Sequence, residues 1–147
     1  FFDLEDMGNI DNLPFAIGAR AFVKRNRFYR PSGGVIVDMV CDKNLSIPKE
    51  RYSKTQATEL VTRLWEIAAQ QEATVFSENQ GTYIQDDHLP FLEAGIPVVD
   101  LIHYPFPDYW HTAEDTPDKC SSDSLSQVGN VILSLVYNTA KITATSD

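Results

Sequence analysis

The chain has 147 residues, a length that corresponds to one domain and allows a sizeable apolar core. Its 21 acidic side chains outnumber its 12 basic ones, and the resulting formal net charge of −9 argues against a nucleic acid or an anionic membrane as natural partner. No apolar run approaches the roughly 20 residues that span a bilayer. The two cysteines, Cys41 and Cys120, are too few for a disulfide scaffold but sufficient for a single bridge.

Strand-like and helix-like segments alternate in the first part of the chain. Phe1 and Phe2 resemble the end of a strand, and the apolar side of residues 14–24 predicts a short helix. Residues 25–32 are basic and loop-like. Residues 34–40 form a near-continuous apolar run, which is typical of a strand buried on both faces of a mainly parallel sheet.

The same alternation continues to the end of the chain. Ser53 begins a capping-box pattern, and the apolar residues that follow at helical spacing as far as Ala68 predict the clearest helix. Four further elements are expected: a strand over residues 73–76, a helix over 88–94 that ends at Gly95, a buried strand over 96–102, and an amphipathic helix from Ser122 to about Lys141. This order predicts an α/β layered fold, in which functional sites form where strands end.

Apolar runs end at acidic residues in several places, and a histidine follows the last of them. Carboxylates and an imidazole at one sheet edge have the oxygen and nitrogen ligand types of a hydrolytic zinc centre, with acids left over to act as a base. The candidates are Glu5, Asp6, Asp38, Asp86, Asp100 and His111.

The order of these motifs resembles the C-terminal half of the zinc-dependent aminopeptidase family, to which the glutaminyl cyclases also belong. The resemblance implies a three-layer α/β sandwich with a mostly parallel mixed sheet, helices on both faces, and one or two zinc ions. The matching segments are residues 1–8, 18–20, 35–40, 85–92, 95–97, 110–112 and 114–117.

One expected motif is absent from the chain. Members of the family carry His-x-Asp well upstream of the Glu-Asp pair, and this chain opens on Phe1 without that motif. We therefore expect residues 1–147 to be the C-terminal portion of a single zinc exopeptidase-like domain. Its N-terminal part would then be a necessary partner, since half a sheet leaves one edge unpaired.

The resemblance assigns roles to the candidate metal-site residues. Glu5 corresponds to the general base, and Asp6 and His111 correspond to zinc ligands. Asp38 corresponds to a second-metal ligand in two-zinc aminopeptidases or to a hydrogen-bonded acid in single-zinc cyclases. Alternatives from the residues alone are a solvated turn for the Glu5–Asp6 pair and a strand-end cap for Asp38, although a buried, unpaired carboxylate is costly.

The resemblance also implies residues that contact the substrate. Asp86 corresponds to an acid in the hydrogen-bond network around the substrate in the cyclases, with Gln85 offering a backbone donor, and Trp110 corresponds to a wall of the pocket. From the local pattern, Asp87 is expected to cap the following helix and His88 to be structural rather than a ligand.

The resemblance also bears on the surroundings of His111 and on position 100. Glu114 or Asp115 is expected to orient the ring of His111, because ligating histidines usually bond a partner through their other nitrogen. Asp100 stands where animal-type cyclases commonly have histidine, which is a departure from the cyclase branch.

The leading interpretation is a zinc-dependent aminopeptidase that removes N-terminal residues from peptides. The alternative is a glutaminyl-peptide cyclase that forms N-terminal pyroglutamate, and a third hypothesis is a non-catalytic binding domain that retains the fold. In the first two cases the partner is a peptide N-terminus. The family resemblance favours a secreted or periplasmic location.

Overall fold

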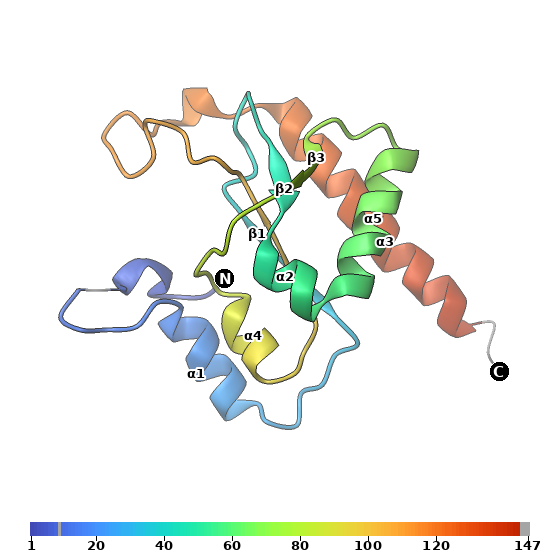
Figure 1. The fold of residues 1–147 in the computed structure, drawn as a ribbon, viewed down its shortest axis with the longest axis horizontal. Helices are drawn as coiled ribbons and strands as arrows, with labels where there is room; N and C mark the ends of the chain where they lie inside the picture. Colours follow the sequence, from blue (N-terminus) through green and yellow to red (C-terminus); the bar gives the residue numbers. More distant parts are fainter. Residues whose placement is uncertain (9, 145–147) are drawn as a thin grey trace. The chain divides into compact units, whose positions relative to one another are not determined.

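The computed structural model describes residues 1–8 and 10–144 of the chain, with side chains through residue 137. Two compact units are formed, and each is described by itself. Unit 1 comprises Phe1–Val37, Lys49–Val61 and Gln80–Leu101, and unit 2 comprises Asp38–Pro48, Thr62–Asn79 and the described residues from Ile102 onward. The elements in chain order (Figure 1) are η1 (Glu5–Met7), α1 (Ile17–Arg25), β1 (Gly34–Asp38), β2 (Ile47–Lys49), α2 (Arg51–Gln56), α3 (Thr58–Gln70), β3 (Phe76–Gln80), α4 (Leu89–Glu93), β4 (Val98–Ile102), η2 (Pro117–Lys119) and α5 (Ser122–Ala144).

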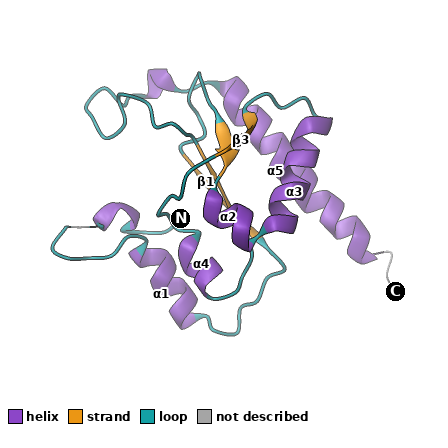
Figure 2. Cartoon of the chain, in the orientation of Figure 1, coloured by secondary structure: helices purple, strands orange, loops and turns teal. Residues whose placement is uncertain are grey.

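The strands form two parallel pairs, β1 with β4 and β2 with β3, and helices alternate with them along the chain (Figure 2). The expected α/β class is therefore confirmed. Every residue of β4 is buried, whereas β1 is only half-buried and Val37 is 45% exposed. The expectation that the first strand is buried on both faces is wrong, because among the described residues β1 has a strand neighbour on one side only.

The apolar core of unit 1 lies where α1 packs against α4. Its buried members are Ala16, Ala19, Phe91, Ile96 and Val98. The ring of Phe2 adds to this core with its centroid 5.8 Å from that of Phe91. The predicted strand at Phe1 and Phe2 is not formed, since this segment is irregular and contributes a side chain to the core instead.

The helical segment after β2 begins earlier than predicted and is broken. Glu50, not Ser53, is the N-cap residue, and its carboxylate accepts hydrogen bonds from the backbone N–H groups of Tyr52 and Ser53. Ser53 lies inside α2 and is buried. Ala57, with φ of −131°, separates α2 from α3, so one predicted helix is two.

The bounds of the other helices lie close to those predicted from local sequence signals. Gly95 has φ of +74°, a left-handed conformation that suits glycine, and it follows α4 as predicted. The predicted helix at residues 14–24 begins three residues later, and α5 begins at Ser122 as predicted. Within the described residues, no helix is both long enough and apolar enough to cross a membrane.

Unit 2 contains a disulfide between Cys41 and Cys120, which are 79 residues apart in sequence. The sequence alone did not decide whether these two cysteines pair, and the structure shows that they do. Close to it, the Ser124 hydroxyl donates to the Asp42 carbonyl oxygen at 2.7 Å, so the start of α5 is tied to the turn after β1. The indole N–H of Trp65 donates to the carbonyl oxygen of Ser77 at 2.8 Å, which joins α3 to β3.

Candidate active site

Backbone hydrogen bonds fix the Glu5–Asp6 segment against the start of α1. The first free N–H groups of this helix donate to carbonyl oxygens of the preceding segment: Ala16 N to Glu5 O at 2.9 Å, and Gly18 N to Asp3 O at 2.9 Å. A Cβ atom at Gly18 would lie 2.5 Å from the Asp3 oxygen, so this close approach requires glycine. Glu5 is half-buried and Asp6 is exposed.

Asp38 and Asp100 lie on the paired strands β1 and β4. Asp38 ends β1, is half-buried, and is followed by Met39 with a left-handed φ of 51°. Asp100 lies in the middle of β4 with no exposed surface. The acid enclosed by an apolar run is therefore Asp100 rather than Asp38.

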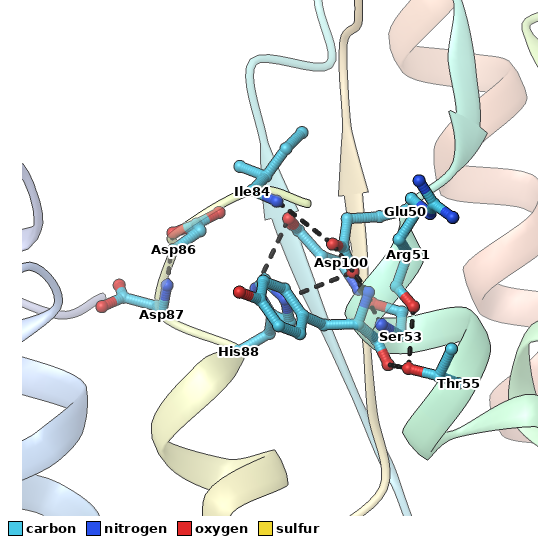
Figure 3. A network of polar contacts seen from close by, with 10 residues as sticks. Glu50, Arg51, Ser53, Thr55, Ile84, Asp86, Asp87, His88 and Asp100 are labelled. Atoms are coloured by element: carbon cyan, nitrogen blue, oxygen red, sulfur yellow. Dashed lines mark hydrogen bonds and ion pairs between the residues drawn. The ribbon is translucent and has the colours of Figure 1, made fainter. Parts of the chain in front are cut away.

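Asp100 belongs to a buried polar cluster, called here the Glu50 cluster (Figure 3). Its members are Glu50, Ser53, His88 and Asp100. His88 has no exposed surface and lies between two carboxylates, with Nε2 3.3 Å from Glu50 Oε2 and Nδ1 3.5 Å from Asp100 Oδ2. The Ser53 hydroxyl donates to Glu50 at 2.8 Å and accepts from the Asp100 N–H at 3.0 Å.

Hydrogen bonding decides the pKa of Glu50. Burial alone would raise this pKa, but the contact with His88 and the donors of Ser53 and Tyr52 stabilise the carboxylate and together lower it. The cluster thus holds an ionised acid in the interior of unit 1.

Asp86 lies next to the Glu50 cluster and is buried. Its Oδ1 accepts from the N–H of Asp87, and its Oδ2 has no hydrogen-bond partner among the residues that the structure describes. Gln85 beside it is exposed. His88, rather than the predicted Asp87, occupies the N-cap position of α4, and the His88 side chain makes no capping hydrogen bond.

The predicted zinc ligands provide a suitable donor set. Asp6, Asp38 and His111 offer two carboxylates and an imidazole, the ligand types that zinc takes in catalytic sites. Asp6 and His111 are exposed and Asp38 is half-buried. Unit 1 contains Glu5, Asp6 and Asp86, and unit 2 contains Asp38 and His111.

A second donor group emerges from the structure. Asp86, His88 and Asp100 each offer one ligand atom, and these atoms lie within 4.8 Å of one another in the part of the chain that the structure describes. Both ring nitrogens of His88 face carboxylates of the Glu50 cluster, so contacts within the cluster account for the same arrangement.

His111 is an exposed residue of a partly exposed loop of stacked rings, Tyr104–Thr112, called here the aromatic loop. The ring of Trp110 stacks on Phe106 at 4.4 Å and on the His111 imidazole at 3.9 Å between centroids. His111 has a left-handed φ of 58°, which is uncommon for a residue other than glycine and is found at functional sites. The predicted orienting roles of Glu114 and Asp115 stay predictions.

Sequence reasoning missed Glu50 and Ser53 as site residues. The capping-box pattern placed the helix start at Ser53, although Glu50 lies two residues after Pro48 and directly before the first helical turn. A helix start at Arg51 would have drawn attention to Glu50, but not to its contacts with Ile84 and His88.

The chain belongs to peptidase family M28, whose sequence profile matches residues 1–136. A glutaminyl-peptide cyclotransferase from Bos taurus is 45% identical over 56 residues, which cover 36% of this chain and 16% of the bovine protein. The fold is similar to that of a Porphyromonas gingivalis glutaminyl cyclase, with a TM-score of 0.87 and 30% identity over 95% of this chain and 52% of that chain. A Zn-dependent exopeptidase from Parabacteroides distasonis gives a TM-score of 0.87 and 29% identity over 94% of this chain and 53% of that chain.

These comparisons confirm the resemblance and the fold expected from the sequence. The chain spans about half the length of the solved structures that it matches.

Proposed function

We propose that the protein carrying this chain is a zinc-dependent glutaminyl-peptide cyclase, which converts N-terminal glutamine of peptides to pyroglutamate. The observation that carries the proposal is the likeness to the bovine cyclotransferase and to the bacterial cyclase. It favours the cyclase, the alternative from the sequence, over the aminopeptidase. The buried Oδ2 of Asp86, without a hydrogen-bond partner among the described residues, supports the proposal as an acceptor for a substrate N–H.

The residues of the chain supply the proton transfers. The α-amine of the substrate attacks the γ-carbonyl carbon, a new C–N bond forms, and the carboxamide C–N bond breaks with release of ammonia. Glu5 takes the proton from the attacking amine and returns it to the leaving nitrogen. Asp86 accepts a hydrogen bond from the substrate, and Trp110 forms an apolar wall of its pocket.

Zinc has a defined place in this scheme. Asp6 and His111 would hold it, together with ligands of the upstream part of the domain, and Asp38 would act as a hydrogen-bonded acid. When bound, zinc supplies a Lewis acid that polarises the γ-carboxamide.

An aminopeptidase is the second candidate, favoured by the likeness to the Zn-dependent exopeptidase. Asp38 would then be a ligand of a second zinc ion, and Glu5 would take the proton of the attacking water. Two bound zinc ions would support this candidate, one would support the cyclase, and none would support the non-catalytic binding domain.

The deciding experiment offers the full-length protein two peptides that differ only in their N-terminal residue, glutamine or leucine. We expect ammonia and a pyroglutamyl product from the first and no reaction of the second. Release of free N-terminal amino acids would instead support the aminopeptidase. No reaction with either peptide would contradict both activities.

Two variants separate proton transfer from metal binding. Glu5→Gln keeps the side-chain shape and removes the base, so turnover should fall about 10²–10⁴-fold with zinc content unchanged. His111→Ala should lose zinc and turnover together and recover part of both in excess zinc. Elemental analysis beside turnover measures both; zinc loss in the Glu5 variant alone would reverse the assignment.

The disulfide supports a location outside the cytosol. A bridge between Cys41 and Cys120 persists in oxidising compartments and is rare in the reducing cytosol. Secretion or periplasmic export of the protein therefore belongs to the proposal, and cell fractionation tests it.

A further inference from the structure

We propose that Glu50 is a positioning residue, which fixes Asp86 by holding both ends of the segment from Ile84 to His88. The inference rests on the proposed function, in which Asp86 contacts the substrate. It assigns Glu50 a task that neither the sequence motifs nor the helix that it caps would require.

One carboxylate binds the segment at two points. The N–H of Ile84 donates to Glu50 Oε1 at 3.2 Å, and Nε2 of His88 lies 3.3 Å from Glu50 Oε2. Asp86 lies midway between these two points in the sequence, and the close-up view shows it beside them (Figure 3). The backbone N–H of Ile84 on one side of Asp86 and the imidazole ring of His88 on the other side therefore both contact the Glu50 carboxylate.

Glu50 is itself held firmly. Its carboxylate accepts from Tyr52 N at 2.9 Å, from Ser53 N at 2.6 Å and from the Ser53 hydroxyl at 2.8 Å. The same hydroxyl accepts from the N–H of Asp100 at 3.0 Å, which connects the cluster to β4. Glu50 is only 1% exposed, so solvent competes little for these bonds.

Helix capping alone does not account for a glutamate here. Serine, threonine, aspartate and asparagine are the preferred N-cap residues, because a short side chain suffices to reach the first free N–H groups. The additional methylene of Glu50 lets its carboxylate reach Ile84 and His88 as well. The length of this side chain thus matches the positioning task.

The principal test is the Glu50→Gln variant of the full-length protein. Glutamine has nearly the same shape but turns an N–H₂ group toward donors, so the clamp on the segment is weakened. We expect kcat for cyclisation to fall about 10–100-fold, as for a small misplacement of a catalytic group, with KM and zinc content nearly unchanged.

A matched control removes a helix cap elsewhere. The hydroxyl of Ser121 accepts from the N–H groups of Asp123 at 3.2 Å and Ser124 at 3.4 Å at the start of α5. Ser121→Ala should lower stability and leave kcat unchanged. An equal loss of kcat in this control would mean that general destabilisation explains the Glu50 effect.

A double-mutant cycle shows whether Glu50 acts through Asp86. In an Asp86→Asn background, Glu50→Gln should have little further effect on kcat, because the residue that it positions has been disabled. Additive losses would overturn the proposal. If Glu50→Gln does not fold, Ser53→Ala replaces it in the cycle, with a smaller expected loss of several-fold.

Hydrogen exchange separates this inference from the proposed function. Exchange of the peptide that spans Ile84–His88 should be faster in Glu50→Gln than in the wild type, whether or not the protein cyclises glutamine. An inactive wild type with this exchange pattern would refute the cyclase and retain the clamp. Unchanged exchange refutes the clamp. Loss of zinc from Glu50→Gln would also overturn it, because Glu50 would then support metal binding by the donor group of Asp86, His88 and Asp100 rather than position Asp86.

Discussion

The Glu50 cluster and the aromatic loop both carry ionisable residues beside the candidate active-site residues, but different forces hold them. In the cluster, each of the four side chains is at most 1% exposed and each contacts another member. In the aromatic loop, His111 is exposed, has a left-handed backbone, and is held by ring stacking.

This difference determines how each region responds to substitution. A buried charge that loses its partner is very costly, so the members of the cluster depend on one another. A residue of an exposed loop is replaced at little cost, because water solvates what remains. We therefore expect substitutions in the cluster to cost much more stability than substitutions in the loop.

The largest expected effect is that of His88→Leu. The substitution leaves the carboxylates of Glu50 and Asp100 buried without the ring between them, and the free energy of unfolding should fall by about 3–5 kcal/mol. The same substitution in the loop, His111→Leu, should change it by less than about 0.5 kcal/mol. Urea unfolding of both variants with a metal chelator present measures the difference, and equal losses would abolish the distinction between the regions.

The disulfide should contribute the next largest effect. It closes a chain segment with a sequence separation of 79 and follows the aromatic loop by eight residues, at Cys120. Replacing both cysteines by alanine should lower the free energy of unfolding by about 2–4 kcal/mol, because the unfolded chain gains freedom. A reducing agent should destabilise the wild type similarly and leave the double variant unaffected. Insensitivity of the wild type would show that the bridge adds no stability.

Elements with local signals could be predicted from the sequence. The bounds of α1, α4 and α5 lie close to those predicted, because the signals for them are local. Amphipathic spacing marks the helices, and Gly95 marks the end of α4. β2 was missed because it has only three residues and includes Pro48, so pairing with β3 defines it. The predicted strand at residues 73–76 overlaps β3 only at Phe76.

The candidate site was predictable only in part for a related reason. Resemblance identified Glu5, Asp6 and His111, whose motifs are contiguous in sequence, and their catalytic roles stay predictions. Glu50 contacts Ile84, which is 34 residues away, and no local pattern signals such a contact. Its role depends on tertiary packing.

A smaller effect concerns pH and again contrasts the two regions. Burial lowers the pKa of His103, just before the aromatic loop, and the nearby Asp42 carboxylate only partly opposes this. The unfolded chain therefore binds a proton more readily, and stability should fall as the pH decreases below about 6.5, the ordinary histidine value. The pKa of Glu50 is lowered in the folded protein. Its contribution to stability is therefore fully present above about pH 4.5, the ordinary glutamate pKa, and is lost as the pH falls through the folded pKa.

The two steps can be assigned with variants. In unfolding experiments from about pH 8 to pH 3, His103→Gln should remove the decline near neutral pH, and Glu50→Gln should reduce the decline in acid. An unaltered profile in either variant would contradict the corresponding assignment.

The smallest expected effect tests the backbone of the aromatic loop. His111 has φ of 58°, a conformation that costs a residue with a Cβ atom roughly 1 kcal/mol relative to glycine. His111→Gly and His111→Ala both remove the ring that stacks on Trp110, so the difference between them reports the backbone alone. We expect the glycine variant to be more stable than the alanine variant by up to about 1 kcal/mol in urea unfolding, although glycine also gives the unfolded chain more freedom. Both should lose zinc equally, since neither carries an imidazole. An alanine variant that is the more stable of the two would contradict the expectation that the left-handed backbone at position 111 favours glycine.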